Sequence, residues 1–327
     1  MKRSILLSTA GLVLALLGIQ GSAEAQKKNL AMGSTSTSSS HYAYFVGAAK
    51  ALNVLMPDVN VSVVETGATV DNLRRMQKGL LDLGLASTDQ TYLAWKGEDI
   101  WKDSPFEGVR LLWMYSISAN LVVVREETGI KSIYELSGKK FNPGFRGSAV
   151  EKSTEVAFGV LGIKPDWQRM GTADVVDAMK DKRIVGFAKA GAGYGHDAST
   201  MDIATQAPLR TLPYSEEDMK KIKAARPHIP WVKVPAGSIK GMGEFWTTVS
   251  LAFVAASKDM PPELAYRLVK AIWEGQEHQP QSVMGVAYKN PGLSPELALS
   301  PLHAGAIKYY RELGFKVPDH LVPPEAK

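Results

Sequence analysis

The chain has 327 residues, of which 45% are hydrophobic, 22% are charged and 8% are aromatic, and its formal net charge is +5. This ordinary globular composition excludes a largely disordered chain, a collagen and a coiled coil, and the length predicts about two lobes. The sequence has no cysteine, which excludes disulfides, thiolate metal sites and cysteine nucleophiles, and its basic residues are too mixed with acidic ones to favour nucleic-acid binding.

The N-terminus has the pattern of a secretory signal peptide. Two basic residues, Lys2 and Arg3, precede the apolar run Ile5–Ile19. Small residues follow, and we expect cleavage after Ala25. The alternative is one uncleaved anchor helix, although the run is shorter than the about 20 apolar residues of a membrane span. With no cysteine for a lipid anchor, an exported protein stays near the cell only inside an outer membrane, so the expected location is the periplasm.

Apolar periodicity from Asn29 onward predicts alternating strands and helices. The first expected strands are Leu30–Met32, Val59–Val64 and Leu83–Ala86. Each is followed by an expected helix, at His41–Met56, Asp71–Leu80 and Thr88–Trp95. This alternation is typical of an α/β lobe whose helices cover a mostly parallel sheet.

Two strand runs without an intervening helix follow, at Val109–Ile117 and Leu121–Val124. The α/β alternation then resumes. Its expected strands include Phe141, Ile184–Ala188 and Val249–Ala255. Its expected helices are Ala149–Leu161, Ala173–Lys180, Pro262–Glu277, Gln281–Tyr288 and His303–Leu313.

This order predicts two α/β lobes joined by extended crossings near Ser118–Val122 and Thr248–Phe253. We expect a signal peptide at 1–25, a discontinuous first lobe at 26–118 and 253–327, and a second lobe at 119–252. The alternative is one larger doubly wound domain with inserted loops.

Three strand-to-helix turns of the first lobe are candidate ligand-binding segments: Gly33–Tyr42, Glu65–Asn72 and Ala86–Gln90. All three are small or polar in composition. Backbone N–H groups at a helix start attract anions, and ligands of open α/β sheets gather at the carboxyl ends of strands. Each turn alone has an ordinary alternative, a surface loop or a helix cap. Three in one lobe are expected to converge on one edge of the sheet.

The second lobe offers two more segments. In the turn Asn142–Glu151, Arg146 supplies a forked donor for a carboxylate, and its alternative is an exposed solubilising charge. The segment Lys189–His196 follows an expected strand and brings a second basic residue, Lys189. It narrowly misses the dinucleotide pattern G-x-G-x-x-G, because His196 stands at the last position.

No segment favours an enzyme. The six histidines form no H-E-x-x-H motif, and neither a phosphate-binding loop nor a G-x-S-x-G elbow is present. We expect His41 and His196 to be helix-start or loop residues rather than general bases. A secreted hydrolase with a Ser–His–Asp triad assembled across the chain stays open as an alternative. We expect no catalytic residue, no metal and no cofactor.

Six segments are informative because of the order in which they occur along the chain. They are Gly33-Ser34 with His41-Tyr42, Glu65–Leu73, Gly79–Asp89, Leu121–Arg125, Gly129–Lys139 and Pro301–Arg311. In this order they resemble the TAXI family of solute receptors, which serve tripartite ATP-independent periplasmic (TRAP) transporters. The resemblance covers nearly the whole mature chain.

The resemblance implies a type II-like, two-lobed periplasmic binding protein, with a mixed sheet and flanking helices in each lobe and a two-strand hinge. Such a receptor is not an enzyme. It captures a small organic carboxylate, of the amino-acid or oxo/dicarboxylate type, and delivers it to a TRAP membrane permease driven by an ion gradient. The alternative is a sensor that signals to a membrane partner.

The candidate ligand-binding residues combine the positions that match the family with the two basic residues. They are Ser38, Ser39, Ser40, His41, Tyr42, Thr66, Gly67, Ala68, Ser87, Thr88, Gln90, Arg146, Gly147, Ser148, Ala149, Val150 and Lys189. Three features depart from the family pattern: a Ser/Thr-rich first loop, Ala149-Val150 in place of the commoner Gly-Thr, and Lys189 with a Gly-rich turn in place of a proline-containing stretch. The identity of a family ligand such as glutamate is therefore not transferred to this chain.

Overall fold

The computed structural model describes residues 27–275 and 298–327. The predicted signal peptide at 1–25 and the helix expected at 281–288 lie outside the described residues. Within these two ranges, no helix has both the length and the apolar character needed to cross a bilayer.

The first lobe is a sheet with helices packed against it. Strand β1 (Lys28–Gly33) pairs in parallel with β2 (Val59–Val64) and with β3 (Leu83–Ser87). Strand β10 (Phe245–Ser257) then runs antiparallel to β3, so the sheet is mixed rather than mostly parallel. The helices of this lobe are α1 (Ser40–Leu55), α2 (Thr69–Gln77), α3 (Thr88–Lys96), α8 (Pro262–Glu274) and α10 (Ala304–Glu312).

The second lobe has shorter strands. Strand β5 (Lys140–Asn142) pairs in parallel with β6 (Asp166–Trp167) and β7 (Gly186–Ala190). Two further strands pair antiparallel with long strands: β8 (Leu209–Leu212) with β4 (Val109–Arg125), and β9 (Trp231–Val234) with β10. The helices are α4 (Ala149–Leu161), α5 (Thr172–Lys180), α6 (Ala198–Ala204) and α7 (Glu216–Ala225). Short 3₁₀ turns lie at Asp99–Trp101, Glu126–Thr128, Ile133–Leu136, Asp319–Leu321 and Pro324–Ala326.

Two long strands connect the lobes. Strand β4 (Val109–Arg125) is continuous, so the expectation of two separate strand runs here is wrong. The polar residues between those runs keep the strand intact because they are buried and paired: Ser118 lies opposite Ser250 of β10. Asn120 donates through Nδ2 to Thr248 Oγ1 at 3.1 Å and accepts through Oδ1 from Ser250 Oγ at 2.8 Å. These bonds link β4 to β10 where the chain passes between the lobes.

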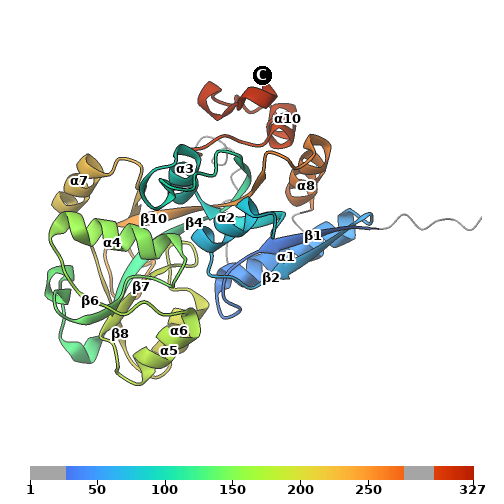
Figure 1. The fold of residues 1–327 in the computed structure, drawn as a ribbon. Helices are drawn as coiled ribbons and strands as arrows, with labels where there is room; N and C mark the ends of the chain where they lie inside the picture. Colours follow the sequence, from blue (N-terminus) through green and yellow to red (C-terminus); the bar gives the residue numbers. More distant parts are fainter. Residues whose placement is uncertain (1–26, 276–297) are drawn as a thin grey trace, which may run out of the picture.

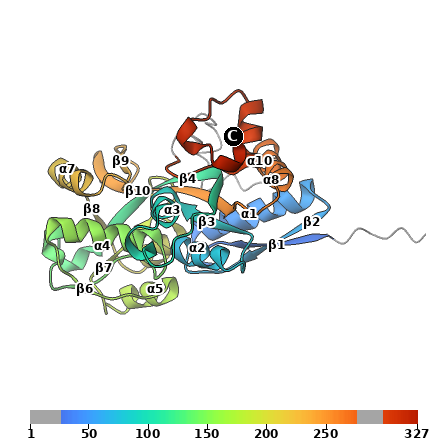
Figure 2. The same cartoon turned by 45° about the horizontal axis from the view of Figure 1, so that its top comes forward.

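The two long strands contribute to different apolar cores in the two lobes. The core of the first lobe includes β4 residues up to Tyr115 and β10 residues from Val249 onward. The two cores of the second lobe are formed by residues between Ala119 and Phe245. Figures 1 and 2 show α4, α5 and α7 on one side of the long strands and α1, α8 and α10 on the other. The molecule is therefore two-lobed with a two-strand hinge, and the limits at 118/119 and 252/253 stay a proposal.

Candidate functional site

A cavity of about 50 Å³ lies between the two lobes, against the hinge strand β10. Its first-lobe wall follows the carboxyl ends of β1, β2 and β3, where the sequence predicts ligand-binding turns. The lining residues are Thr35, Ser39, His41, Ala68, Thr69, Leu85, Ser87, Phe145, Ser148, Ala149, Val150, Ala188, Lys189, Ala190, Ser250 and Ala252.

Four helices begin at this cavity. The residues that precede α1, α2, α3 and α4 at their N-termini all line it: Ser39, Ala68, Ser87 and Ser148. Side-chain hydroxyls cap only α1 and α4, whereas α2 and α3 have no side-chain cap. Each helix N-terminus carries a partial positive charge, so four together favour an anion. In α2, the N–H groups of Val70 and Asp71 are already bonded to the Gly147 carbonyl, so this helix contributes mainly its charge.

Ala68 adopts a backbone conformation that side chains rarely permit, with φ 76° and ψ −149°. This region is essentially restricted to glycine and costs about 1–3 kcal/mol for other residues. Thr66 supports the turn, because its hydroxyl accepts from the Ala68 N–H at 3.2 Å and donates to the Ser34 carbonyl at 2.8 Å. The strained residue, Ala68, therefore lies in the wall of the cavity, directly before the start of α2.

Lys189 is the one formally charged side chain among the described residues that line the cavity. It is 6% exposed, and its Nζ lies 3.3 Å from Asp197 Oδ2, 3.5 Å from Ser39 Oγ and 3.9 Å from the centre of the Phe145 ring. These contacts are long, which leaves the ammonium donors available for a shorter bond to a ligand. Burial lowers the pKa of Lys189, and Asp197 opposes that shift.

Asp197 holds Lys189 from behind. It is fully buried, and its carboxylate accepts from the Ser199 hydroxyl at 3.0 Å and from the Thr200 N–H at 3.1 Å. Burial raises the pKa of Asp197, but Lys189 and these hydrogen bonds outweigh it, so the pKa lies below its ordinary value. Because its carboxylate is already occupied, Asp197 orients Lys189 and balances its charge, and it does not line the cavity.

His41 contributes a buried neutral imidazole. Its Nδ1 shares a hydrogen bond of 2.8 Å with the Tyr115 hydroxyl, and its Nε2 has no partner among the described residues. Burial and then the charge of Lys189 lower the pKa of His41 to about 3, against a smaller opposing effect of Asp197. The ring is therefore uncharged at neutral pH and presents one unused nitrogen in a cavity wall.

About half of the predicted site residues lie at the cavity. Those that line it are Ser39, His41, Ala68, Ser87, Ser148, Ala149, Val150 and Lys189. The structure does not bring the others to its wall: Ser38, Ser40, Tyr42, Thr66, Gly67, Thr88, Gln90, Arg146 and Gly147.

Several predicted residues that do not line the cavity make contacts between the two lobes beside it. The Ser40 hydroxyl accepts from the Ala198 N–H of the second lobe at 3.0 Å. The Gly147 carbonyl accepts from the Val70 N–H at 2.9 Å, so the second lobe caps the start of α2. Gly67 lies so close to the second lobe that a Cβ there would stand 2.8 Å from the Arg146 carbonyl oxygen. The lobes are in contact, and the cavity lies between them.

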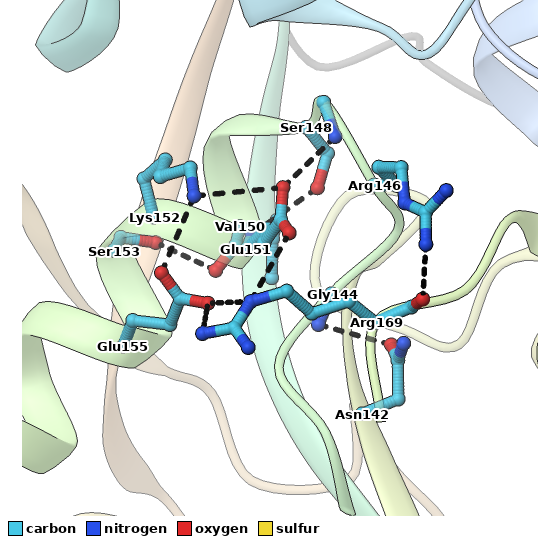
Figure 3. Close-up of polar contacts among 11 residues, drawn as sticks. Asn142, Gly144, Arg146, Ser148, Val150, Glu151, Lys152, Ser153, Glu155 and Arg169 are labelled. Atoms are coloured by element: carbon cyan, nitrogen blue, oxygen red, sulfur yellow. Dashed lines mark hydrogen bonds and ion pairs between the residues drawn. The ribbon is translucent and has the colours of Figure 1, made fainter. Parts of the chain in front are cut away.

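The Arg146 side chain points away from this space. It is exposed, and its Nη2 donates to the Arg169 carbonyl at 2.8 Å (Figure 3). We therefore expect Arg146→Ala to change the affinity for a carboxylate solute by less than about 2-fold, because surface charges contribute little. Isothermal titration of the variant and the unmodified protein measures this. A loss of more than 10-fold would return Arg146 to the binding site.

Half of the lining residues are not among the candidates predicted from the sequence. Thr35, Thr69, Phe145 and Ala190 lie inside the candidate turns, beside the residues that were predicted. Leu85, Ala188, Ser250 and Ala252 lie on strands, and the sequence carries no signal that these side chains face a ligand. Asp197 contacts Lys189 but does not line the cavity. In the sequence it follows the Gly-rich turn and is recognisable only as a residue that can cap a helix.

A larger cavity of about 680 Å³ lies on the far side of α3, and Gln90 lines it. Its wall carries charges of both signs, Asp89, Glu98 and Asp99 together with Lys152 and Arg226, and so has no excess of positive charge for a carboxylate ligand. It also reaches Leu299, next to the chain segment outside the described residues. The smaller cavity is therefore the better candidate for an anionic solute.

Comparison with known proteins agrees with this architecture. An ancestral arginine-binding protein bound to arginine superimposes with a TM-score of 0.52 at 14% identity, over 88% of this chain and 98% of that chain. A protein from Bordetella bronchiseptica RB50 gives a TM-score of 0.52 at 14% identity, over 91% of this chain and 86% of that chain. These likenesses confirm the expected two-lobed α/β fold. The sequence profile of the NMT1-like family matches residues 32–314, and the chain belongs to that family.

Proposed function

We propose that this protein is a periplasmic solute receptor of the TAXI type, which captures a small organic carboxylate and delivers it to a TRAP membrane permease. The observation that carries the proposal is the convergence of Lys189 and four helix N-termini on one cavity between two hinged lobes. The ordered resemblance to TAXI receptors supports the choice of permease.

The binding step follows from these groups. A carboxylate in the cavity accepts hydrogen bonds from Lys189 Nζ and from backbone N–H groups, and each charge-assisted bond contributes roughly 1.5–3 kcal/mol. Closure of the lobes about β4 and β10 surrounds the solute and removes water, which strengthens these bonds. The closed surface is then available for recognition by the permease.

The histidine in the cavity supports a receptor rather than a hydrolase. In a Ser–His–Asp triad a carboxylate orients the imidazole through Nδ1, and a serine hydroxyl bonds to Nε2. Here Nδ1 of His41 is bonded to a tyrosine, and Nε2 is bonded to none of the described residues. A pKa of about 3 also makes His41 a weak base.

Binding should depend on pH through Lys189. The folded-state pKa of Lys189 is lowered by burial, so the ammonium loses its proton at a lower pH than an exposed lysine does. We expect affinity for a carboxylate to fall as the pH rises from 6 toward the 10.5 of an ordinary lysine, since the neutral amine does not attract the anion. Titration calorimetry across this range measures the fall, and an affinity that rises with pH would contradict the proposal.

Transport by a TRAP permease predicts a specific energy dependence. Cells that lack this protein should take up a labelled carboxylate slowly, and re-expression of the chain should restore uptake. An ionophore that collapses the ion gradients should abolish the restored uptake at constant ATP. Uptake that instead follows ATP would contradict the TRAP assignment, and binding without any uptake would favour a sensor.

Cleavage after Ala25 is part of the same proposal. We expect a periplasmic extract to contain a protein that begins at Gln26, as mass spectrometry of the N-terminal peptide would show. A membrane-bound protein that retains residues 1–25 would contradict it and favour an uncleaved anchor.

A further inference from the structure

The cavity carries a single positive charge. Lys189 is the one cationic side chain among the described residues of its wall, and the neighbouring His41 is neutral. A solute with two carboxylates needs a second cation or a second set of donors at its far end. No other described side chain that lines the cavity is charged, so a second carboxylate would have no cation at its far end.

The remainder of the wall is largely apolar. Five apolar residues line it: Leu85 of the first lobe, Phe145, Val150 and Ala188 of the second lobe, and Ala252 of the hinge strand. A second carboxylate among these side chains would lose its water without gaining a partner, which is strongly unfavourable. A short aliphatic chain fits the same wall and gains from its burial.

The size of the cavity limits the solute further. Its volume of about 50 Å³ is above the roughly 10–15 Å³ that one water molecule needs. Sites for drug-sized ligands are larger, at about 300–1,000 Å³. The cavity therefore favours a solute much smaller than a drug-sized ligand.

His41 adds a requirement for one polar group. Its side chain is 6% exposed, and the unpartnered Nε2 stands in the wall near Lys189. A buried nitrogen without a partner is unfavourable, so a solute that offers it a hydrogen bond is preferred to one that does not. The 2-oxygen of a carboxylate bound to Lys189 is the group that we expect to make this bond.

We infer that the solute is a short-chain monocarboxylate with an oxygen at position 2, either a 2-oxo or a 2-hydroxy acid. Lys189 and the helix N-termini hold its carboxylate, His41 bonds the 2-oxygen, and the apolar wall accepts a methyl or ethyl group. This inference rests on the proposed function and narrows its substrate class.

The test is titration calorimetry of the purified protein with pyruvate, lactate, propionate, 2-oxoglutarate and glutamate at one pH. We expect pyruvate or lactate to bind at least about 10-fold more tightly than propionate, and at least about 100-fold more tightly than 2-oxoglutarate and glutamate. Tight binding of 2-oxoglutarate or glutamate would overturn this inference and leave the receptor function intact. Binding of none of the five would overturn both.

A variant separates the role of His41 from a general loss of structure. In His41→Phe, the ratio of the affinities for lactate or pyruvate over propionate should fall to about one, because the nitrogen that selects the 2-oxygen is gone. A merely structural role would weaken all three acids equally and preserve the ratio. A preserved ratio would therefore overturn the assignment of His41.

Discussion

Replacing Lys189 with methionine should weaken binding of a carboxylate solute by about 30-fold or more. Loss of one partner of a buried, hydrogen-bonded charge pair costs about 2–5 kcal/mol of binding, and 1.4 kcal/mol corresponds to tenfold. Methionine keeps the unbranched length of the side chain and removes its charge. The measurement is titration calorimetry with the tightest-binding acid, and an affinity within 3-fold of the unmodified protein would contradict the role of Lys189.

The same variant should be less stable, and this effect needs a control. With Lys189 gone, the buried carboxylate of Asp197 has no counter-ion, which costs about 3–5 kcal/mol of the free energy of unfolding. The double variant Lys189→Met/Asp197→Asn removes both charges and keeps a residue that can cap α6. We expect urea denaturation to show stability largely restored in the double variant, and calorimetry to show binding still lost. Recovery of binding together with stability would mean that Lys189 acts only on folding.

Replacing Gly67 with alanine should prevent full closure of the lobes. The added Cβ would lie 2.8 Å from the Arg146 carbonyl oxygen, a backbone atom of the opposite lobe that cannot move independently. The hydrogen bond from the Val70 N–H to the Gly147 carbonyl would also be lost. Since apparent affinity scales with the population of the closed form, we expect solute binding to weaken by about 10–100-fold. Small-angle X-ray scattering should show little or no compaction when solute is added.

A matched control is Gly159→Ala. Gly159 lies in α4 of the second lobe, and a Cβ there would meet no atom within 4 Å. This variant should close and bind as the unmodified protein does. Normal compaction of Gly67→Ala with solute would show that closure does not need the contact at Gly67.

The sequence predicts the first lobe well because its signals are local. Val59–Val64 alternates and forms β2 with those bounds, and polar turns after β1, β2 and β3 do start helices at one edge of the sheet. The second lobe is harder because its elements are short. The strands β6, β8 and β9 and the helices α6 and α7 are not predicted, and several of them depend on pairing with β4 or β10. The continuity of β4 likewise depends on tertiary bonds to Asn120, which no local pattern reveals.

Arg146 and Lys189 show which property of the site could not be predicted from the sequence. In the sequence, Arg146 and Lys189 both follow expected strands, and composition alone cannot say which one faces the ligand. The answer depends on side-chain direction: Arg146 turns outward to the Arg169 carbonyl, whereas Lys189 lies in β7 and extends into the cavity toward Ser39 and Asp197. Phe145, next to Arg146 in sequence, occupies the position expected for the guanidinium.

A crystal structure of the protein with a bound monocarboxylate tests the central claim most directly. The expected result is a carboxylate oxygen at about 2.7–2.9 Å from Lys189 Nζ, in the cavity where α1, α2, α3 and α4 begin. A carboxylate found instead in the larger cavity beyond α3, with Lys189 still bonded only to Asp197 and Ser39, would contradict it.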